Sequence, residues 1–151
     1  LISNDAIDLS VFIMDNLNLD TTTVPMELFA TAELLTFQNK LDEAGMLLDS
    51  IAKDYPEHSL LDDILYAKAQ IAKKRLQAEE EARLYGLIIE KFPEEIKADN
   101  AMFALAQLYE LHFKDIEKAK ELYLKIFTEY SSSTFAIDAR KKYRLLRGDN
   151  I

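Results

Sequence analysis

The sequence predicts an all-α protein, built as a solenoid of antiparallel helical pairs with about eight helices. Three observations support this fold class. The sequence repeats itself with a period of 37 to 38 residues. Within each repeat, apolar residues recur at the spacing of an amphipathic helix. Only three glycines and three prolines occur in 151 residues, too few turn residues for an all-β fold.

The repeat is clearest between residues 51–70 and 88–107. The two segments share Ile51/Ile88, Pro56/Pro93, Glu57/Glu94, Asp62/Asp99, Ala67/Ala104, Ala69/Ala106 and Gln70/Gln107. A third copy extends the pattern through Phe29, Tyr66 and Phe103, through Ala32, Ala69 and Ala106, and through Leu34, Ile71 and Leu108. Small alanines are expected where two helix axes approach closely, because larger side chains would force the helices apart. One inserted residue near Lys114 lengthens the later spacing to 38.

Each element follows from this pattern. The expected helices are residues 4–17, 24–38, 41–54, 59–75, 77–92, 96–113, 115–130 and 133–147. Pro25 fits a helix start, where its missing N–H costs nothing. Pro56 and Pro93 follow the second helix of a pair and end it. Gly148 is expected to end the last helix.

The two ends of the repeat array differ from its middle. Leu9 and Ile13 repeat the pattern of a second helix that has no first helix before it. We therefore expect this chain to be a C-terminal piece of a longer protein, with a Leu9–Ile13 face able to self-associate. The predicted organisation is one domain with an orphan helix at 1–19, repeats at 24–58, 59–95 and 96–132, and a capping helix at 133–151.

Composition excludes several classes of function. A net charge of −9 argues against binding nucleic acid or an anionic membrane surface, which requires Lys and Arg. No apolar run approaches the ~18–20 residues of a membrane span, so direct membrane insertion is not expected. The absence of cysteine removes disulfides, thiolate metal sites and cysteine nucleophiles.

We find no constellation that indicates a catalytic, metal or cofactor site, and we expect no enzyme. His58 and His112 have no ligand at metal-binding spacing and are expected at helix ends. Glu79, Glu80 and Glu81 are expected to form a solvated face that complements a helix dipole. The serines Ser131, Ser132 and Ser133 are expected to cap a helix. The tripeptide Arg147-Gly148-Asp149 is explained by Gly148 as a helix stop.

The residues that recur from repeat to repeat resemble the tetratricopeptide repeat. The third repeat carries its signature positions best, with Met102, Leu105, Ala106, Tyr109, Ala119, Tyr123 and Ile126. The second repeat departs from it at Lys68 and Glu81, where Leu and Ala are expected. The resemblance implies a right-handed α–α superhelix. The period, longer than the usual ~34 residues, is similar to envelope-associated repeat proteins of Gram-negative bacteria, which implies a periplasmic or cell-envelope location.

The resemblance implies a non-catalytic scaffold that binds a partner protein or peptide on its concave face. The candidate groove residues are Phe29, Glu33, Asp63, Tyr66, Gln70, Lys73, Asn100, Phe103 and Gln107. For the aromatics Phe29, Tyr66 and Phe103, one ring per repeat fits either the groove or the packing between helices, and the regular aromatic spacing favours packing. The alternative function is a structural spacer or cap of a longer array, with no ligand of its own.

Overall fold

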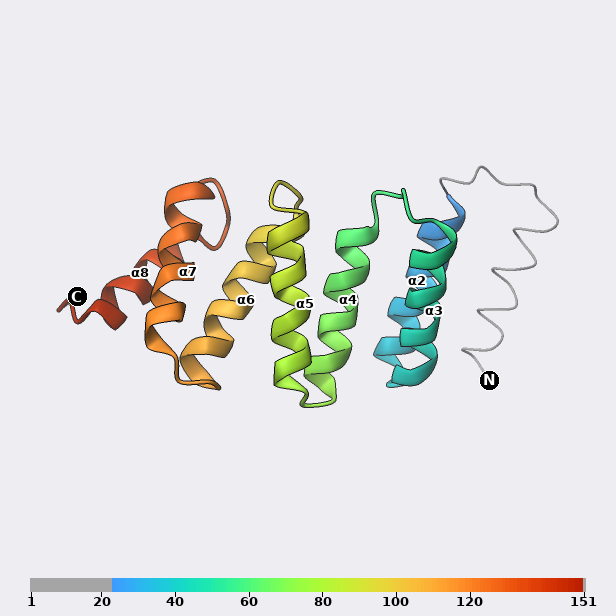
Figure 1. The fold of residues 1–151 in the computed structure, drawn as a ribbon, viewed down its shortest axis with the longest axis horizontal. Coiled ribbons are helices and arrows are strands. Elements are labelled where there is room, and N and C mark those ends of the chain that lie inside the picture. The colour runs from blue at the N-terminus through green and yellow to red at the C-terminus, as the bar shows by residue number, and fades with distance from the viewer. Residues whose placement is uncertain (1–22, 151) are drawn as a thin grey trace. The chain divides into compact units, whose positions relative to one another are not determined.

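The computed structural model describes residues 23–150, and all regular secondary structure in this range is helical (Figure 1). The helices are α2 (Val24–Phe37), α3 (Leu41–Asp54), α4 (Leu61–Lys74), α5 (Ala78–Lys91), α6 (Lys97–Leu111), α7 (Ile116–Glu129) and α8 (Ala136–Arg147). The predicted all-α fold of helical pairs is confirmed. The helix expected at residues 4–17 lies outside the described residues, and the right-handed sense of the superhelix stays a prediction.

The predicted boundaries are within three residues of the observed ones, and α3 has the predicted range. The largest error is at α8, which begins at Ala136 rather than at residue 133. The reason is a turn in which the Ser133 N–H donates to the Tyr130 carbonyl, 2.9 Å. The same turn joins His58 to Tyr55, 3.1 Å, and Glu95 to Phe92, 3.1 Å. The three extra residues of the long repeat therefore form a recurring turn before α4, α6 and α8.

A second recurring turn joins the two helices of each pair. It contains a residue with left-handed backbone conformation: Asn39 at φ 62°, Leu76 at φ 58° and Lys114 at φ 58°. A left-handed residue reverses the chain sharply after a helix, and Asn tolerates this conformation better than Leu or Lys. The step from Leu76 to Lys114 is one residue longer than the step from Asn39 to Leu76. The helix α4 ends two residues before Leu76, whereas α6 ends three residues before Lys114, so the insertion expected near Lys114 lies within this turn.

The chain divides into two compact units, between Ile71 and Ala72. In the first unit, α2 packs antiparallel against α3 (Figure 1). The core that they form with the first part of α4 contains small and branched apolar side chains, namely Ala32, Leu35, Ala44, Leu48, Ile51, Ile64 and Ile71. Ala32 and Ala44 are buried, as expected for positions where helices cross.

In the second unit, each helix packs against the next, from α5 through α6 and α7 to α8. One core cluster of this unit consists of Met102, Ala106, Ala119, Tyr123, Ile126 and Ala139. The helix α8 buries Ala139 and packs Phe135, Tyr143 and Leu146 against this core. Its other face is open, with Ile137 71% and Leu145 55% exposed. One face of α8 is thus buried and the rest lies at the surface.

Candidate functional site

The second unit carries a surface pocket of about 400 Å³, which we call the α6 pocket. Most of its lining comes from one side of α6, with Lys73 from the end of α4 and Glu81 from α5. The lining residues are Lys73, Glu81, Ala104, Gln107, Leu108, Leu111 and His112. Lys73 and Gln107 are two of the residues predicted for a partner-binding groove, and the structure brings them together here.

The α6 pocket combines an apolar strip with hydrogen-bonding groups. Ala104, Leu108 and Leu111 occur at i, i+4 and i+7 and so share one side of the helix. Leu111 is 59% exposed, although it is apolar. The Gln107 amide can both donate and accept hydrogen bonds, as the backbone of an extended peptide requires. Such a surface fits a short segment of protein that presents one apolar side chain.

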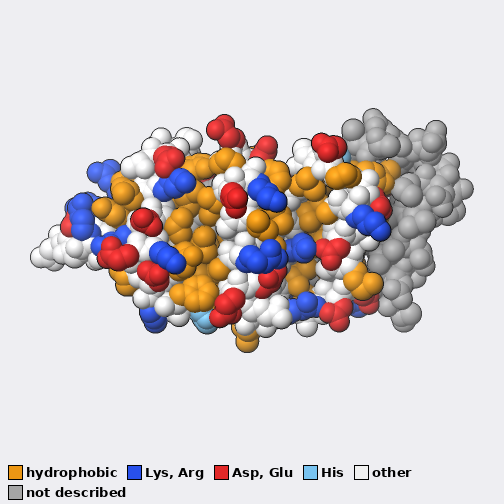
Figure 2. All heavy atoms as spheres, viewed as in Figure 1, with side chains coloured by type: hydrophobic (Ala, Val, Ile, Leu, Met, Phe, Trp, Pro, Cys, Tyr) orange, Lys and Arg blue, Asp and Glu red, His pale blue; other side chains and the backbone are white. Residues whose placement is uncertain are grey.

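Lys73 and Gln107 are among the residues that the sequence predicts for a groove, whereas the apolar residues that line this pocket are not. Leu34, Ile71 and Leu108 were recognised as a recurring position, yet nothing in the period showed that Leu108 would line a pocket. Leu111 carries the clearer signal, since an apolar residue four positions after Gln107 lies on the same helical face. Figure 2 shows hydrophobic side chains gathered over α6, with charged side chains around them.

The other two predicted groove residues of the second unit lie elsewhere. Asn100 lines a separate pocket of about 410 Å³ together with Glu94, Asp99 and Ser133. Phe103 is half-buried and packs against the core of the unit. Its ring stacks on Phe135 with centroids 4.8 Å apart, and it meets Tyr123 edge-on at 5.7 Å. The structure therefore places the Phe103 ring between α6, α7 and the start of α8.

Five predicted groove residues belong to the first unit. Phe29 is half-buried and packs against the core cluster of that unit. Glu33 is exposed on α2. Asp63, Tyr66 and Gln70 are half-buried on α4. The recurring aromatics Phe29 and Phe103 thus both contact core residues of their own units.

Two departures from the repeat signature are explained by polar pairs. Glu81 stands where a small residue is expected, and its carboxylate accepts a hydrogen bond of 2.9 Å from the Tyr85 hydroxyl. Both side chains are buried, at 6% and 1% exposure. The prediction of a solvated face is therefore wrong for Glu81, because the Tyr85 hydroxyl supplies the partner that a buried carboxylate needs. Lys68 reaches from α4 to Asp49 of α3, 2.8 Å away.

The corresponding tyrosine of the next repeat, Tyr123, finds a different partner. With Ala119 four residues before it, the buried Tyr123 hydroxyl donates instead to Glu110 of α6, 2.7 Å away. Glu110 also lies 3.5 Å from the ammonium group of Lys142 in α8. Burial, together with the Glu110 carboxylate, raises the pKa of Tyr123 well above its usual value. One carboxylate thus links α6 to both α7 and α8.

The remaining residues with expected roles lie at helix ends and turns. The His58 ring nitrogen Nδ1 accepts from the Leu60 N–H, 3.2 Å, and exposed His112 follows the end of α6. The expectation that the serines cap a helix is wrong in detail, because Phe135 is the cap residue of α8 and makes no side-chain cap bond. Ser133 instead accepts from the Phe135 N–H, 3.1 Å, and donates to the Asp99 carboxylate.

The described part of the chain has neither a membrane-spanning helix nor a metal-binding cluster. Within residues 23–150, no helix combines the length and apolar character needed to cross a bilayer. The same residues contain no group of three or more His, Cys, Asp or Glu side chains placed to hold a metal ion.

Comparison with known proteins identifies the repeat. Residues 100–133 match the tetratricopeptide repeat family. This segment contains nearly all of α6, the whole of α7 and the turns that follow each of them. No curated protein matches the chain. The matched pair has the core positions Met102, Ala106, Ala119, Tyr123 and Ile126. Residues 100–133 are thus similar in sequence to the tetratricopeptide repeat, and the helical pair that they form agrees with this similarity.

Proposed function

We propose that this protein is a non-catalytic interaction scaffold that binds a peptide segment of a partner protein in the α6 pocket. Proteins of the tetratricopeptide repeat family generally bind other proteins or peptides. The observation that supports this particular site is the exposed side chain of Leu111 beside Gln107 in a pocket of about 400 Å³. Apolar anchors flanked by polar groups supply most of the affinity in protein interfaces of this kind.

The chemistry of the pocket defines the ligand that we propose. An apolar side chain of the peptide would lie against Ala104, Leu108 and Leu111. The Gln107 amide would hydrogen-bond to the peptide backbone, which gives affinity that depends little on sequence. Lys73 and Glu81 supply one cationic and one anionic group, so charges near the apolar residue would set the preference.

The test begins with a peptide library selected on the full chain. Affinities of the selected peptides are then measured by fluorescence anisotropy for three variants. Leu111→Ser and Gln107→Ala should each weaken binding about tenfold, as loss of an interface anchor typically does. Leu76→Ser is the matched control, because Leu76 is 90% exposed and does not line the α6 pocket. Its affinity should equal that of the unmodified protein.

Two results would contradict the proposal. If the selected peptides bound equally well to all three variants, the peptide-binding surface would lie outside the α6 pocket. A library that yields no binder would favour the alternative function, a spacer or cap within a longer array. The further proposal that the scaffold acts in cell-envelope assembly depends on the resemblance of its long repeat. Fractionation of the cells that produce it would test that location.

A further inference from the structure

The helix α8 concentrates positive charge on an otherwise acidic protein. It carries Arg140, Lys141, Lys142, Arg144 and Arg147, with Asp138 as its only acidic residue, whereas the whole chain has a net charge of −9. Such a local reversal of sign attracts negatively charged groups to one place on the surface.

Beside this charge lies a second pocket of about 400 Å³, which we call the arginine pocket. It is lined by Phe127, Arg140, Tyr143, Arg144, Arg147 and Asp149. The rings of Phe127 and Tyr143 meet at 62° with centroids 5.6 Å apart and form its apolar part. The guanidinium carbon of Arg147 lies 5.3 Å from the centre of the Tyr143 ring, a cation–π distance that helps to orient the guanidinium.

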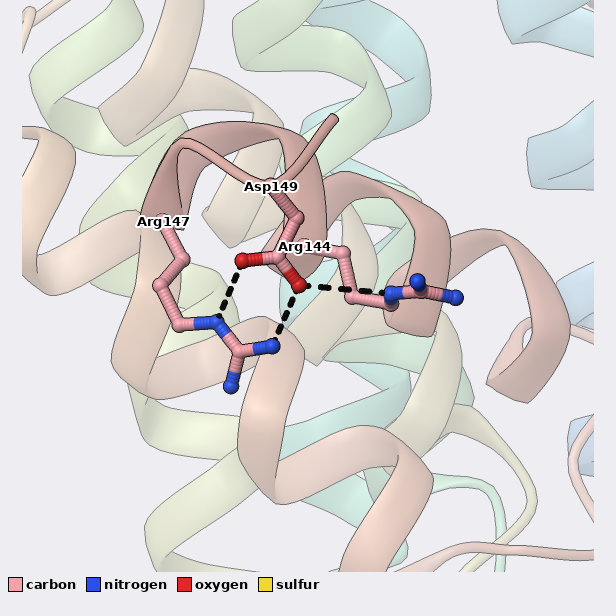
Figure 3. Close-up of polar contacts among 3 residues, drawn as sticks. All are labelled: Arg144, Arg147 and Asp149. Carbon is pink, nitrogen blue, oxygen red and sulfur yellow. Dashed lines mark hydrogen bonds and ion pairs between the residues drawn. The ribbon is translucent and has the colours of Figure 1, made fainter. Parts of the chain in front are cut away.

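The arginine pocket already binds one carboxylate, that of Asp149 (Figure 3). Gly148, in left-handed conformation at φ 97°, turns the chain back after α8. The Gly148 N–H then donates to Leu145 at 3.0 Å and the Asp149 N–H donates to Arg144 at 2.9 Å, the two bonds of a Schellman motif. This turn carries the Asp149 carboxylate to the guanidinium of Arg147.

The carboxylate of Asp149 is held from two sides, as Figure 3 shows. Arg147 donates through Nε at 2.9 Å and also through Nη2, a bidentate arrangement. Arg144 Nε approaches the same carboxylate at 3.4 Å. The hydrogen bond from Arg147 is the main reason that the pKa of Asp149 lies below its usual value. The pocket therefore has a geometry that suits the planar, bidentate recognition of a carboxylate.

One guanidinium of the pocket is not used by this internal contact. Arg140 is exposed, and its side chain makes no hydrogen bond or ion pair with any of residues 23–150. Arg144 has only the single long contact to Asp149 and keeps most of its donors available. The arginine pocket thus has donor capacity for a further carboxylate, next to aromatic rings.

We propose that the arginine pocket binds a carboxylate from an acidic segment of a partner protein, through Arg140 and Arg144. An acidic protein segment fits better than a nucleic acid or a lipid surface for two reasons. The net charge of −9 repels extended polyanions such as DNA or an anionic bilayer at long range. The Asp149 carboxylate inside the pocket disfavours a doubly charged phosphate more strongly than a singly charged carboxylate.

The proposal implies that Asp149 competes with the partner. Its carboxylate occupies Arg147 and contacts Arg144, so a bound partner has access to only part of the arginine cluster. Removing the charge of Asp149 should therefore strengthen binding. This surface uses α7 and α8, whereas the α6 pocket uses α4, α5 and α6, so the two proposals can fail independently.

The test uses the full chain and a hexaglutamate peptide as the probe, with hexaglutamine as the uncharged comparison. NMR spectra of the arginine Nε–H groups should show hexaglutamate shifting the signals of Arg140 and Arg144, while Arg83 stays unchanged. Arg140→Gln should weaken binding about tenfold, as expected for loss of a charge-assisted hydrogen bond. Arg83→Gln removes the same charge from the same unit but outside the pocket, and it should leave the affinity within about twofold.

Asp149→Asn should strengthen binding of hexaglutamate several-fold. Asp138→Asn makes an equal charge change on α8 outside the pocket, and it should not strengthen binding. Equal weakening by Arg140→Gln and Arg83→Gln would overturn the proposal, because it would show nonspecific charge attraction. Binding to phosphatidylglycerol vesicles, inorganic phosphate or duplex DNA without binding to hexaglutamate would also overturn it. The spectra of the unmodified protein give an answer even if a variant fails to fold.

Discussion

The hydroxyl of Tyr130 donates a hydrogen bond of 2.6 Å to the carbonyl of Pro93, one repeat earlier in the sequence. This bond joins the turn before α8 to the turn before α6. A second bond runs from Ser133, in the turn before α8, to the Asp99 carboxylate in the first turn of α6. The turn before α8 is thus bonded both to the turn before α6 and to α6 itself, within the second unit.

The first prediction concerns this pair of turns. Ser133→Ala should lower the free energy of unfolding by about 1–2 kcal/mol, because it removes a hydrogen bond to a charged acceptor and the contact to the Phe135 N–H. Tyr130→Phe should cost less than about 1 kcal/mol, since its bond lies at the surface. Urea denaturation measures both. Ser131→Ala is the control, and an equal loss there would show that the Asp99 contact contributes nothing.

The second prediction concerns Tyr123 at alkaline pH. The folded protein raises the pKa of this hydroxyl, chiefly by burial and then by the Glu110 carboxylate. The stabilisation that the Tyr123 hydroxyl contributes is therefore fully present below the pKa of this group in the unfolded chain, about 10. It is lost as the pH rises above that value. Tyr123→Phe should cost about 1.5 kcal/mol at pH 8. That difference should shrink by about 1.4 kcal/mol per pH unit above pH 10.

The measurement for Tyr123 is denaturant unfolding of both proteins between pH 8 and pH 11. The difference in unfolding free energy between the two proteins cancels the effects of other groups that titrate in this range. A difference that stays constant with pH would show that the Tyr123 hydroxyl ionises no less readily in the folded protein than in the unfolded chain.

The third prediction concerns the glycines. A methyl group added at Gly45 or Gly86 would meet no atom within 4 Å. Both lie inside helices, where glycine costs about 0.5–1 kcal/mol relative to alanine. Gly45→Ala and Gly86→Ala should therefore each stabilise the protein by that amount in thermal or urea unfolding. Gly148→Ala should instead destabilise it by about 1 kcal/mol, because φ there is 97°. Stabilisation at Gly148 would contradict the assigned turn.

The fourth prediction compares two phenylalanines. Phe103→Ala should cost about 2–3 kcal/mol, because the ring packs on Phe135 and Tyr123 in the core of the second unit. Phe37→Ala should change stability by less than about 0.5 kcal/mol, since Phe37 is 84% exposed. Both values come from urea unfolding curves. If Phe103→Ala were as mild as Phe37→Ala, the ring would be free to face a ligand rather than the core.

The fifth prediction concerns Asp149. Its pKa is lowered mainly by the hydrogen bond from Arg147. The contact therefore supports the end of α8 above the ordinary carboxyl pKa and is lost as pH falls through the lowered value. A carbon-13 NMR titration should show the Asp149 carboxyl ionising below the usual range. Arg147→Gln should return it toward 3.8, while Arg83→Gln should leave it unchanged. An unshifted titration in the unmodified protein would contradict the geometry of Figure 3.

In the described residues, the sequence by itself determined the helical pairs, their period and their boundaries to within three residues. Apolar side chains at helical spacing specify which face of a helix is buried, and alanines such as Ala106 and Ala119 mark where axes cross. These signals are local, so they can be recognised in the sequence without knowing which helix packs against them. The start of α8 was missed because serines at 131–133 are equally compatible with a turn and a helix cap.

Only the tertiary structure decided which polar residues lie together. Glu81 was expected at the surface but is buried with the Tyr85 hydroxyl as its partner. The sequence could not show this, because a buried partner for a carboxylate depends on packing as well as on spacing. The spacing of Phe103 favoured the core without excluding a groove, and the rings that pack against it, Tyr123 and Phe135, are 20 or more residues away. The arginine pocket likewise requires α7 beside α8. Contacts between elements depend on how faces meet in space, which a helical period does not encode.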